Sequence, residues 1–398
     1  MRSRITTHRS AALVPLLIAL VAALVAALVA ASCSSSGSGH PSAAVTTSTL
    51  DRSAEPAYAK PGPYAVGYTT LQLPDRAVAV WYPADPTAVV GKPKATYNQA
   101  TPLPDNLKGI VPAKYNTVVT MDAYPAVAAD TKHGPYPVVL FSHGAGGYRL
   151  VNSALDVGIA SWGYVVVSVD YFERGLLAQV TNKTYPKDPT RDPRLMLASL
   201  DLVERASANA ASLLSGIVDS RHVAAVGHSA GGGTAFDALN DPRVAVAIGW
   251  APVAPTGPPA AKPTMIIGAS GDIALTPARL TATYAGFPAP KRRIEIEAGG
   301  HNSFSDVCTV IRAGGGLIEF ARRNHLVADN LLALGLNGCK STDIAPAQFW
   351  PIVQHFTVAE LRSVFGQDPH PVGLGDAMTT AFDTTAFGGV TIKYQHSP

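Results

Sequence analysis

A serine stands between two glycines in the segment Gly227–Gly231, which reads Gly-His-Ser-Ala-Gly. The apolar run Val223–Val226 directly before it predicts a buried strand, and the residues after it are compatible with a helix. A serine at a sharp turn between strand and helix presents its hydroxyl for nucleophilic attack, and such a turn accommodates only small residues two positions away on either side. We therefore interpret Ser229 as a nucleophile; the alternative is a glycine-rich turn packed under a helix.

A nucleophilic serine needs two backbone N–H groups nearby, aimed at the oxygen that becomes negative during the reaction. One is expected from Ala230, directly after the serine. The second is expected from the loop after an earlier strand, where residues 141–147 read Phe-Ser-His-Gly-Ala-Gly-Gly, and Ala145 is the preferred donor. Gly144 and Gly146 would let this backbone approach a bound substrate closely, so we count them as substrate-binding positions.

The general base should be one of the 11 histidines. In the order typical of such hydrolases, the base comes after the nucleophile and after the last strand of the sheet. His301 fits this order, because it follows the predicted strand Arg293–Glu297 on a glycine-flanked loop, at the edge where parallel strands end. His143 precedes the nucleophile and is interpreted as a residue that orients its loop.

The third member of a triad should be a carboxylate on the loop after the preceding strand, where it fixes the imidazole tautomer. The predicted strand Thr264–Gly268 leads directly to Asp272, which we assign to this role. Asp306, five residues beyond His301, is the alternative, although it is more simply a helix-capping residue. Trp250 follows another predicted strand and is interpreted either as lining the acyl side of the cleft or as an ordinary packed aromatic residue.

The elements that must position these residues alternate between short β-branched runs and longer helix-compatible stretches, which predicts a mostly parallel sheet flanked by helices on both faces. The segments 84–134 and 171–191 lack clear periodicity and are either loops over a site or long connections. The predicted strands are Val66–Leu73, Val78–Tyr82, Val138–Phe141, Val165–Val169, Val223–Gly227, Val244–Ile248, Thr264–Gly268 and Arg293–Glu297. The predicted helices are Val151–Ser161, Asp192–Gly216, Ser229–Asn240, Pro277–Ala285 and one around Val358–Phe365, before an irregular tail to Pro398.

The N-terminus has the three parts of an export signal: arginines, an apolar stretch from Ala11 to Ala31, and small residues before Cys33. These small residues resemble the lipobox of bacterial lipoproteins, which implies a lipidated Cys33 and a membrane anchor. The alternative is an uncleaved anchor, because the apolar stretch is long enough to span a bilayer. We therefore expect a signal peptide over residues 1–32, a flexible tether over 33–62, and one catalytic domain over 63–398 with a C-terminal extension from about 340.

Three cysteines in an exported chain leave one unpaired unless one has another use. If Cys33 carries lipid, Cys308 and Cys339 remain as a pair and are expected to form a disulfide; the alternative is two buried free thiols. The chain has 31 Lys and Arg against 28 Asp and Glu, and residues 1–32 hold three arginines and no acid. The rest is formally neutral, so we expect no nucleic-acid partner. Nothing in the sequence indicates an oligomeric state.

Four segments together carry a resemblance to a known family: residues 141–149, residues 160–164, the turn at Ser229 and residues 300–306. They resemble the secreted platelet-activating-factor acetylhydrolase group of α/β-hydrolases, whose cousins include bacterial polyester hydrolases and dienelactone-hydrolase-like proteins. The resemblance covers most of Pro61 to Asp306. It implies an α/β-hydrolase fold, a triad of Ser229, Asp272 and His301, no metal or organic cofactor, and hydrolysis of carboxylic esters at or near lipid.

Two departures restrict what the resemblance implies. The group often has a bulky residue after the nucleophile, where this chain has Ala230, and dienelactone hydrolases proper use a cysteine nucleophile. The sequence therefore predicts an exported, lipid-anchored serine esterase that acts on lipid or small acyl esters. The alternatives are a polyester hydrolase similar to cutinases, a peptidase or thioesterase on the same fold, and a surface lipoprotein that binds lipid or a partner without turnover.

Overall fold

The computed structural model describes residues 54–181, 183–325, 329–376, 378 and 390–398. Its centre is a ten-stranded sheet in the order β12-β11-β10-β9-β8-β6-β7-β2-β1-β5, and β3 and β4 form a separate pair. The strands are β1 Val66–Gln72, β2 Ala77–Pro83, β3 Thr96–Tyr97, β4 Val119–Thr120, β5 Tyr124–Pro125, β6 Tyr136–Ser142, β7 Val165–Val169, β8 Val218–His228, β9 Val244–Trp250, β10 Thr264–Ala269, β11 Lys291–Ile296 and β12 Ile392–Ser397.

The middle of the sheet is parallel, from β7 through β6, β8, β9 and β10 to β11. The pairs β1–β2, β2–β7 and β11–β12 are antiparallel. Every residue of β6, β7 and β10 is buried, as expected for continuously apolar strands covered on both faces. Each predicted strand is present, so the mostly parallel sheet that the sequence predicts is confirmed.

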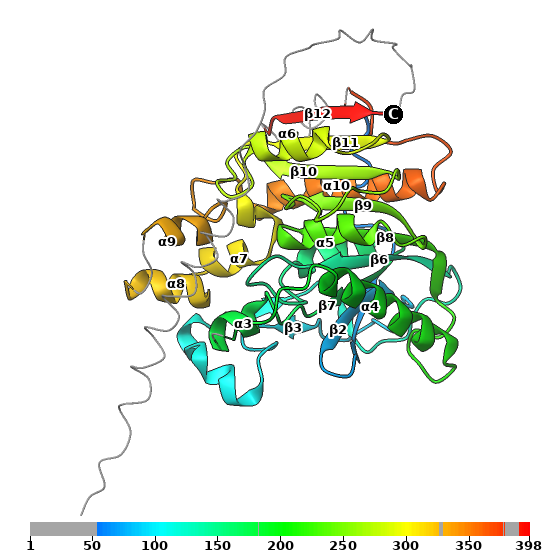
Figure 1. Cartoon of the computed structure of the whole chain (residues 1–398). Coiled ribbons are helices and arrows are strands. Elements are labelled where there is room, and N and C mark those ends of the chain that lie inside the picture. The colour runs from blue at the N-terminus through cyan, green and yellow to red at the C-terminus, as the bar shows by residue number, and fades with distance from the viewer. Residues whose placement is uncertain (1–53, 182, 326–328, 377, 379–389) are drawn as a thin grey trace, which may run out of the picture.

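Helices cover both faces of this sheet (Figure 1). On one face lie α4 (Arg191–Ala208), α5 (Ala230–Ala238) and α6 (Pro277–Ala285), and on the other lie α2 (Ser153–Ala160) and α10 (Pro346–Val364). Beyond the ends of the parallel strands, Figure 1 shows α7, α8 and α9. The remaining helices are α3 Leu176–Thr181, α7 Val307–Arg312, α8 Gly316–Arg323, α9 Asp329–Gly335 and the 3-10 turns η1 Asp105–Ile110, η2 Ala113–Tyr115 and η3 His301–Phe304.

The C-terminal region differs from the prediction in two places. Helix α10 begins at Pro346, twelve residues before the expected start, because proline is well suited to the first turn of a helix. The tail is not irregular throughout, since Ile392–Ser397 forms β12, which pairs antiparallel with β11 along its whole length. Polar residues dominate this strand and it has little apolar periodicity, as is common where a strand closes an exposed sheet edge.

The predicted tether extends too far into the folded domain. Tyr58 and Ala59 are buried, and the Tyr58 ring packs edge-on against Trp162 with ring centres 4.9 Å apart. The Gln354 side chain donates to the carbonyl oxygens of Tyr58 and Lys60, both at 2.7 Å. The folded domain therefore begins before Tyr58 and not at residue 63.

The predicted signal peptide and Cys33 lie outside the described residues. Among the residues that the structure does describe, no helix combines the length and the apolar character needed to cross a membrane.

The buried N-terminal segment generates a stability prediction. We expect Tyr58→Ala to lower the free energy of unfolding by about 3 kcal/mol, because it empties a buried aromatic site. For a chain of this size, that loss corresponds to a fall in Tm of roughly 4 °C in a thermal melt. Val90→Ala is the control, since Val90 is 77% exposed. An unchanged Tm for Tyr58→Ala would show that the segment does not belong to the folded domain.

Candidate active site

Ser229 lies at the sharp turn between β8 and α5 and has φ 56° and ψ −121°, a conformation that side chains with a Cβ rarely adopt. The turn is so tight that a Cβ at Gly227 would lie 2.1 Å from the Gly231 carbonyl oxygen. A Cβ at Gly231 would lie 1.9 Å from the carbonyl oxygen of Ser142, at the end of β6. The two glycines are therefore required by close backbone contact, and the strained serine is typical of a nucleophile elbow.

Ser229, His301 and Asp272 come together from the carboxyl ends of three strands. The Ser229 Oγ lies 3.0 Å from His301 Nε2, and His301 Nδ1 lies 2.8 Å from Asp272 Oδ2. The three side chains thus form one hydrogen-bonded chain, in the order that the sequence predicts. In this arrangement a proton can pass from the serine to the imidazole, with the carboxylate on its far side.

The Asp272 carboxylate is held by its own loop. Its Oδ1 accepts hydrogen bonds from the amides of Ala274 and Leu275, both at 2.8 Å, while Oδ2 faces His301. Burial alone would raise the pKa of Asp272, but the hydrogen bond with His301 and the loop amides outweigh it and leave this pKa below the ordinary value. The carboxylate is therefore ionised at neutral pH.

The predicted oxyanion positions lie beside the serine. A Cβ added to Gly144 would lie 3.1 Å from the Ser229 Cβ, so the 141–147 loop packs directly against the nucleophile. Within the described part of the chain, the amides of Ala145 and Ala230 have no backbone acceptor. Both are thus free to donate to an oxygen that develops negative charge. Gly146 has φ 74° and lies against the Gln179 side chain, which limits any larger residue at this position.

Buried polar residues fix the oxyanion loop. His143 is fully buried; its Nε2 accepts from the Tyr171 amide at 3.0 Å, so its Nδ1 donates to the Gly144 carbonyl at 2.9 Å. Burial lowers the pKa of His143 well below its usual range, and the imidazole stays neutral. Arg174 donates to the His143 carbonyl and to Ser142 Oγ. These contacts fit the predicted orienting role of His143. Sequence reasoning missed Arg174, because it lies in a segment without periodicity.

His228, directly before the nucleophile, was also missed as a functional residue. It is 5% exposed, and its Nε2 lies 2.9 Å from the carbonyl oxygen of His301. Burial, with a smaller contribution from the nearby His301, lowers the pKa of His228 to about 3. A neutral His228 therefore donates to the backbone of His301 and helps to hold it in place. Its position in the Gly227–Gly231 motif was the signal that could have identified it.

Of the interpretations that the sequence left open, Asp306 as a triad member and Trp250 as a cleft residue are wrong, whereas Trp250 as a packed aromatic residue is confirmed. Asp306 does not contact His301; its Oδ2 instead accepts from the hydroxyls of Tyr97 and Ser153, both at 2.6 Å. Trp250 is fully buried and donates from its indole nitrogen to Thr357 Oγ1 at 3.1 Å. The expectation that Trp250 lines the cleft is wrong, because the side chain of this last β9 residue points into the core between the sheet and α10.

The expected disulfide is present between Cys308 and Cys339. Cys308 lies in α7, directly after the segment that carries His301, and both cysteines are buried. The bond therefore ties the C-terminal part of the chain to the histidine loop.

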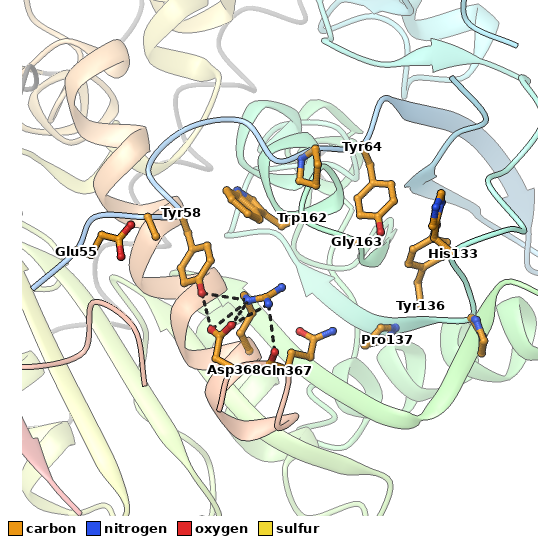
Figure 2. Close-up of a pocket in the computed structure, with 14 residues that line it drawn as sticks. Glu55, Tyr58, Tyr64, His133, Tyr136, Pro137, Trp162, Gly163, Gln367 and Asp368 are labelled. Carbon is orange, nitrogen blue, oxygen red and sulfur yellow. Dashed lines mark hydrogen bonds and ion pairs between the residues drawn. The ribbon is translucent and has the colours of Figure 1, made fainter. Parts of the chain in front are cut away.

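One cavity is lined by none of the three triad residues. This cavity, of about 610 Å³, lies at the opposite edge of the sheet, where β6 and β7 begin, and Figure 2 shows Tyr58, Tyr64, Tyr136 and Trp162 around it. A much smaller cavity, of about 10 Å³, lies beside His143 and Leu103. We place the chemistry at Ser229 because the larger cavity has no nucleophile paired with a base among its lining residues.

Two family models match parts of the chain. The model described as PET hydrolase-like matches residues 137–315, and that of platelet-activating factor acetylhydrolase, isoform II, matches residues 59–197. A bis(hydroxyethyl) terephthalate hydrolase of Streptomyces coelicolor is 29% identical, over 46% of this chain and 54% of that protein. A platelet-activating factor acetylhydrolase of Canis lupus familiaris is 24% identical, over 27% of this chain and 32% of that protein. The match thus spans less than two thirds of either relative.

The solved structure of a ferulic acid esterase from Streptomyces cinnamoneus aligns with a TM-score of 0.57 and 24% identity, over 77% of this chain and 92% of that chain. This likeness confirms the predicted α/β-hydrolase fold. The sequence matches support the α/β-hydrolase group that the motifs of this chain resemble.

The strained backbone of Ser229 predicts that glycine at this position is more stable than alanine, which is the reverse of the usual order. Glycine adopts a positive φ at little cost, whereas alanine keeps the Cβ, and this Cβ makes a positive φ unfavourable. We expect Ser229→Gly to unfold with a free energy about 1–3 kcal/mol higher than Ser229→Ala in a denaturant titration. At Ser199, in the middle of α4, the same pair should show the usual order with alanine more stable. Equal stabilities of the two Ser229 variants would mean that the turn is not strained.

The buried Asp306 predicts a pH-dependent stability. Burial, partly offset by hydrogen bonds from Ser153 and Tyr97, raises its pKa to about 6. The folded state then holds a proton that the unfolded state releases, so stability falls as pH rises from about 4 to 6. Asp306→Asn cannot ionise, and its Tm should fall less than that of the native protein between pH 4 and pH 7. If Tm changes equally with pH in the native protein and in Asp306→Asn, the raised pKa of Asp306 is contradicted.

Proposed function

We propose that this protein is an exported serine hydrolase that cleaves carboxylic esters through an acyl-enzyme. The observation that carries the proposal is the hydrogen-bonded chain from Ser229 Oγ through His301 to Asp272, at 3.0 and 2.8 Å, on a strained nucleophile elbow. The amides of Ala145 and Ala230, which have no backbone acceptor among the described residues, support the other requirement of acyl transfer, and we assign them to the oxyanion hole. The relatives named for ester hydrolysis support the same chemistry.

In the first half of the reaction, His301 Nε2 accepts the Ser229 proton while Oγ bonds to the carbonyl carbon of the ester. The carbonyl oxygen becomes negative and accepts hydrogen bonds from the two amides. When the tetrahedral intermediate collapses, the C–O bond of the ester breaks, and the leaving alcohol takes the proton from the imidazolium. Asp272 remains ionised and holds the imidazole in the tautomer with the proton on Nδ1.

In the second half, water replaces the alcohol. His301 accepts a proton from this water, the hydroxide attacks the acyl carbon, and the Ser229 oxygen leaves with the proton returned from the imidazolium. The products are the free acid and the regenerated serine. The backbone contact from His228 to the His301 carbonyl keeps the imidazole facing Ser229 through both halves.

For the substrate we propose an ester of a small acyl or aryl acid. The relatives named as an acetylhydrolase and as the hydrolase of a terephthalate ester support this proposal, because both names describe small acids. The relatives are named for a terephthalate ester, for platelet-activating factor and for ferulic acid, which differ in the alcohol and in the acid. A lipidated Cys33 would hold the exported enzyme at a membrane.

The proposal predicts a sharp loss of activity in three variants. On p-nitrophenyl acetate we expect Ser229→Ala and His301→Ala each to lower kcat roughly a millionfold, and Asp272→Ala about ten-thousandfold, because the triad acts as a unit. Across p-nitrophenyl esters from acetyl to palmitoyl, kcat/KM should be highest for the short acyl groups. Ser215→Ala is the control and should keep native activity.

A fluorophosphonate probe separates an esterase from a protein that only binds lipid or a partner. The native protein should be labelled at Ser229, whereas Ser229→Ala should stay unlabelled. A native protein that is neither labelled nor active would favour the binding function. Normal turnover by Ser229→Ala would show that another residue is the nucleophile.

A further inference from the structure

A turn formed by residues 334–339, here called the bridging turn, lies between the loop of Asp272 and the loop of His301. It begins with the last two residues of α9 and ends at Cys339, well after the last triad residue in the sequence. Its backbone is bonded to the histidine loop: the Asn302 amide donates to the Asn337 carbonyl at 2.9 Å. The Asn302 side chain donates to the carbonyls of Leu334 and Gly335, both at 3.1 Å.

The side chain of Asn337 joins the two loops. Its Oδ1 accepts from the His301 amide at 2.7 Å and from the Ile273 amide at 3.2 Å. Its Nδ2 donates to the Gly271 carbonyl at 2.8 Å. The residues on either side of Asp272 and the backbone of His301 are thus held by one amide group. Only a side chain with an acceptor and a donor at this length can make all three bonds.

The bridging turn itself has little freedom to move. Cys339, two residues after Asn337, is bonded to Cys308, which follows the histidine loop. The turn also packs closely on that loop, since a Cβ at Gly300 would lie 2.4 Å from the Gly338 nitrogen. The disulfide and the backbone contacts therefore fix Asn337 relative to His301, and the Asn337 amide extends this fixed unit to the loop of Asp272.

We propose that Asn337 is a positioning residue that sets the Asp272–His301 contact, with the disulfide-anchored bridging turn as its support; this rests on the proposed function. Asp272 and His301 belong to separate loops after β10 and β11, and their 2.8 Å hydrogen bond depends on how these loops lie. A misplacement of about 1 Å in a reacting group can cost on the order of a hundredfold in rate. The printed bonds of Asn337 go to backbone atoms of the two loops and to none of the triad side chains, so it acts through the two backbones.

The test is steady-state kinetics on p-nitrophenyl acetate with Asn337→Ala and Asn337→Asp, at least 20 °C below the Tm of each variant. For Asn337→Ala we expect kcat to fall roughly 10- to 100-fold with KM within about twofold, and the rate of fluorophosphonate labelling to fall in parallel. Asn337→Asp keeps an acceptor for both amides, but it replaces the donor to the Gly271 carbonyl with a second carboxylate oxygen. Its kcat should fall less, by roughly 3- to 10-fold.

Asn324→Ala is the matched control, because Asn324 lies in the same disulfide-closed segment and its exposed side chain, among the described residues, bonds to the Phe320 carbonyl in the helix directly before it. Its kcat should equal that of the native protein. A lowered Tm with native kcat in Asn337→Ala would show a purely structural role and overturn the proposal. If Asn337→Ala does not fold, native kcat in Asn337→Asp has the same meaning. A native protein without esterase activity would overturn this proposal together with the proposed function.

Discussion

The hydrogen bonds that join Ser229, His301 and Asp272 connect three loops that lie far apart in the sequence. The sheet and the helices around it hold these loops close together. Parallel strands end at one edge of the sheet, so the loops after β8, β10 and β11 begin side by side. The burial of these strands on both faces leaves their ends little freedom. A serine in an unfavourable backbone conformation is stable only in such a rigid setting.

Burial also decides which groups near the serine carry charge. His228 and His143 are both buried, and burial keeps each imidazole neutral, so each serves as a fixed donor to a backbone carbonyl. Asp272 is buried too, but two loop amides and His301 stabilise its ionised form. The triad thus has one ionised carboxylate, that of Asp272, facing the imidazole that accepts the serine proton. His143 and His228 stay neutral and hold backbone atoms in place.

Local patterns in the sequence were enough to predict the central part of the site. The spacing of Gly227 and Gly231 around Ser229 reflects contacts within a few residues of the turn, and continuous apolar runs mark buried strands, so both are legible in one sequence. Contacts between distant segments cannot be recognised from one sequence. Asn337 bonds to loops more than thirty residues away, and no periodicity marks it. Whether Trp250 packs in the core depends on which face of β9 lies against α10, and the sequence does not show this. Strand β12 is a polar edge strand with too few apolar residues to be recognised from the sequence.

The segment around Tyr58 enters the domain beside Trp162 and α10, at the edge where the parallel strands begin, whereas Ser229 lies where they end. The chain before residue 54 therefore joins the folded domain at the side of the sheet opposite to the nucleophile. Whatever that chain carries is attached away from Ser229, and the edge of the sheet where the strands end is left for the approach of a substrate.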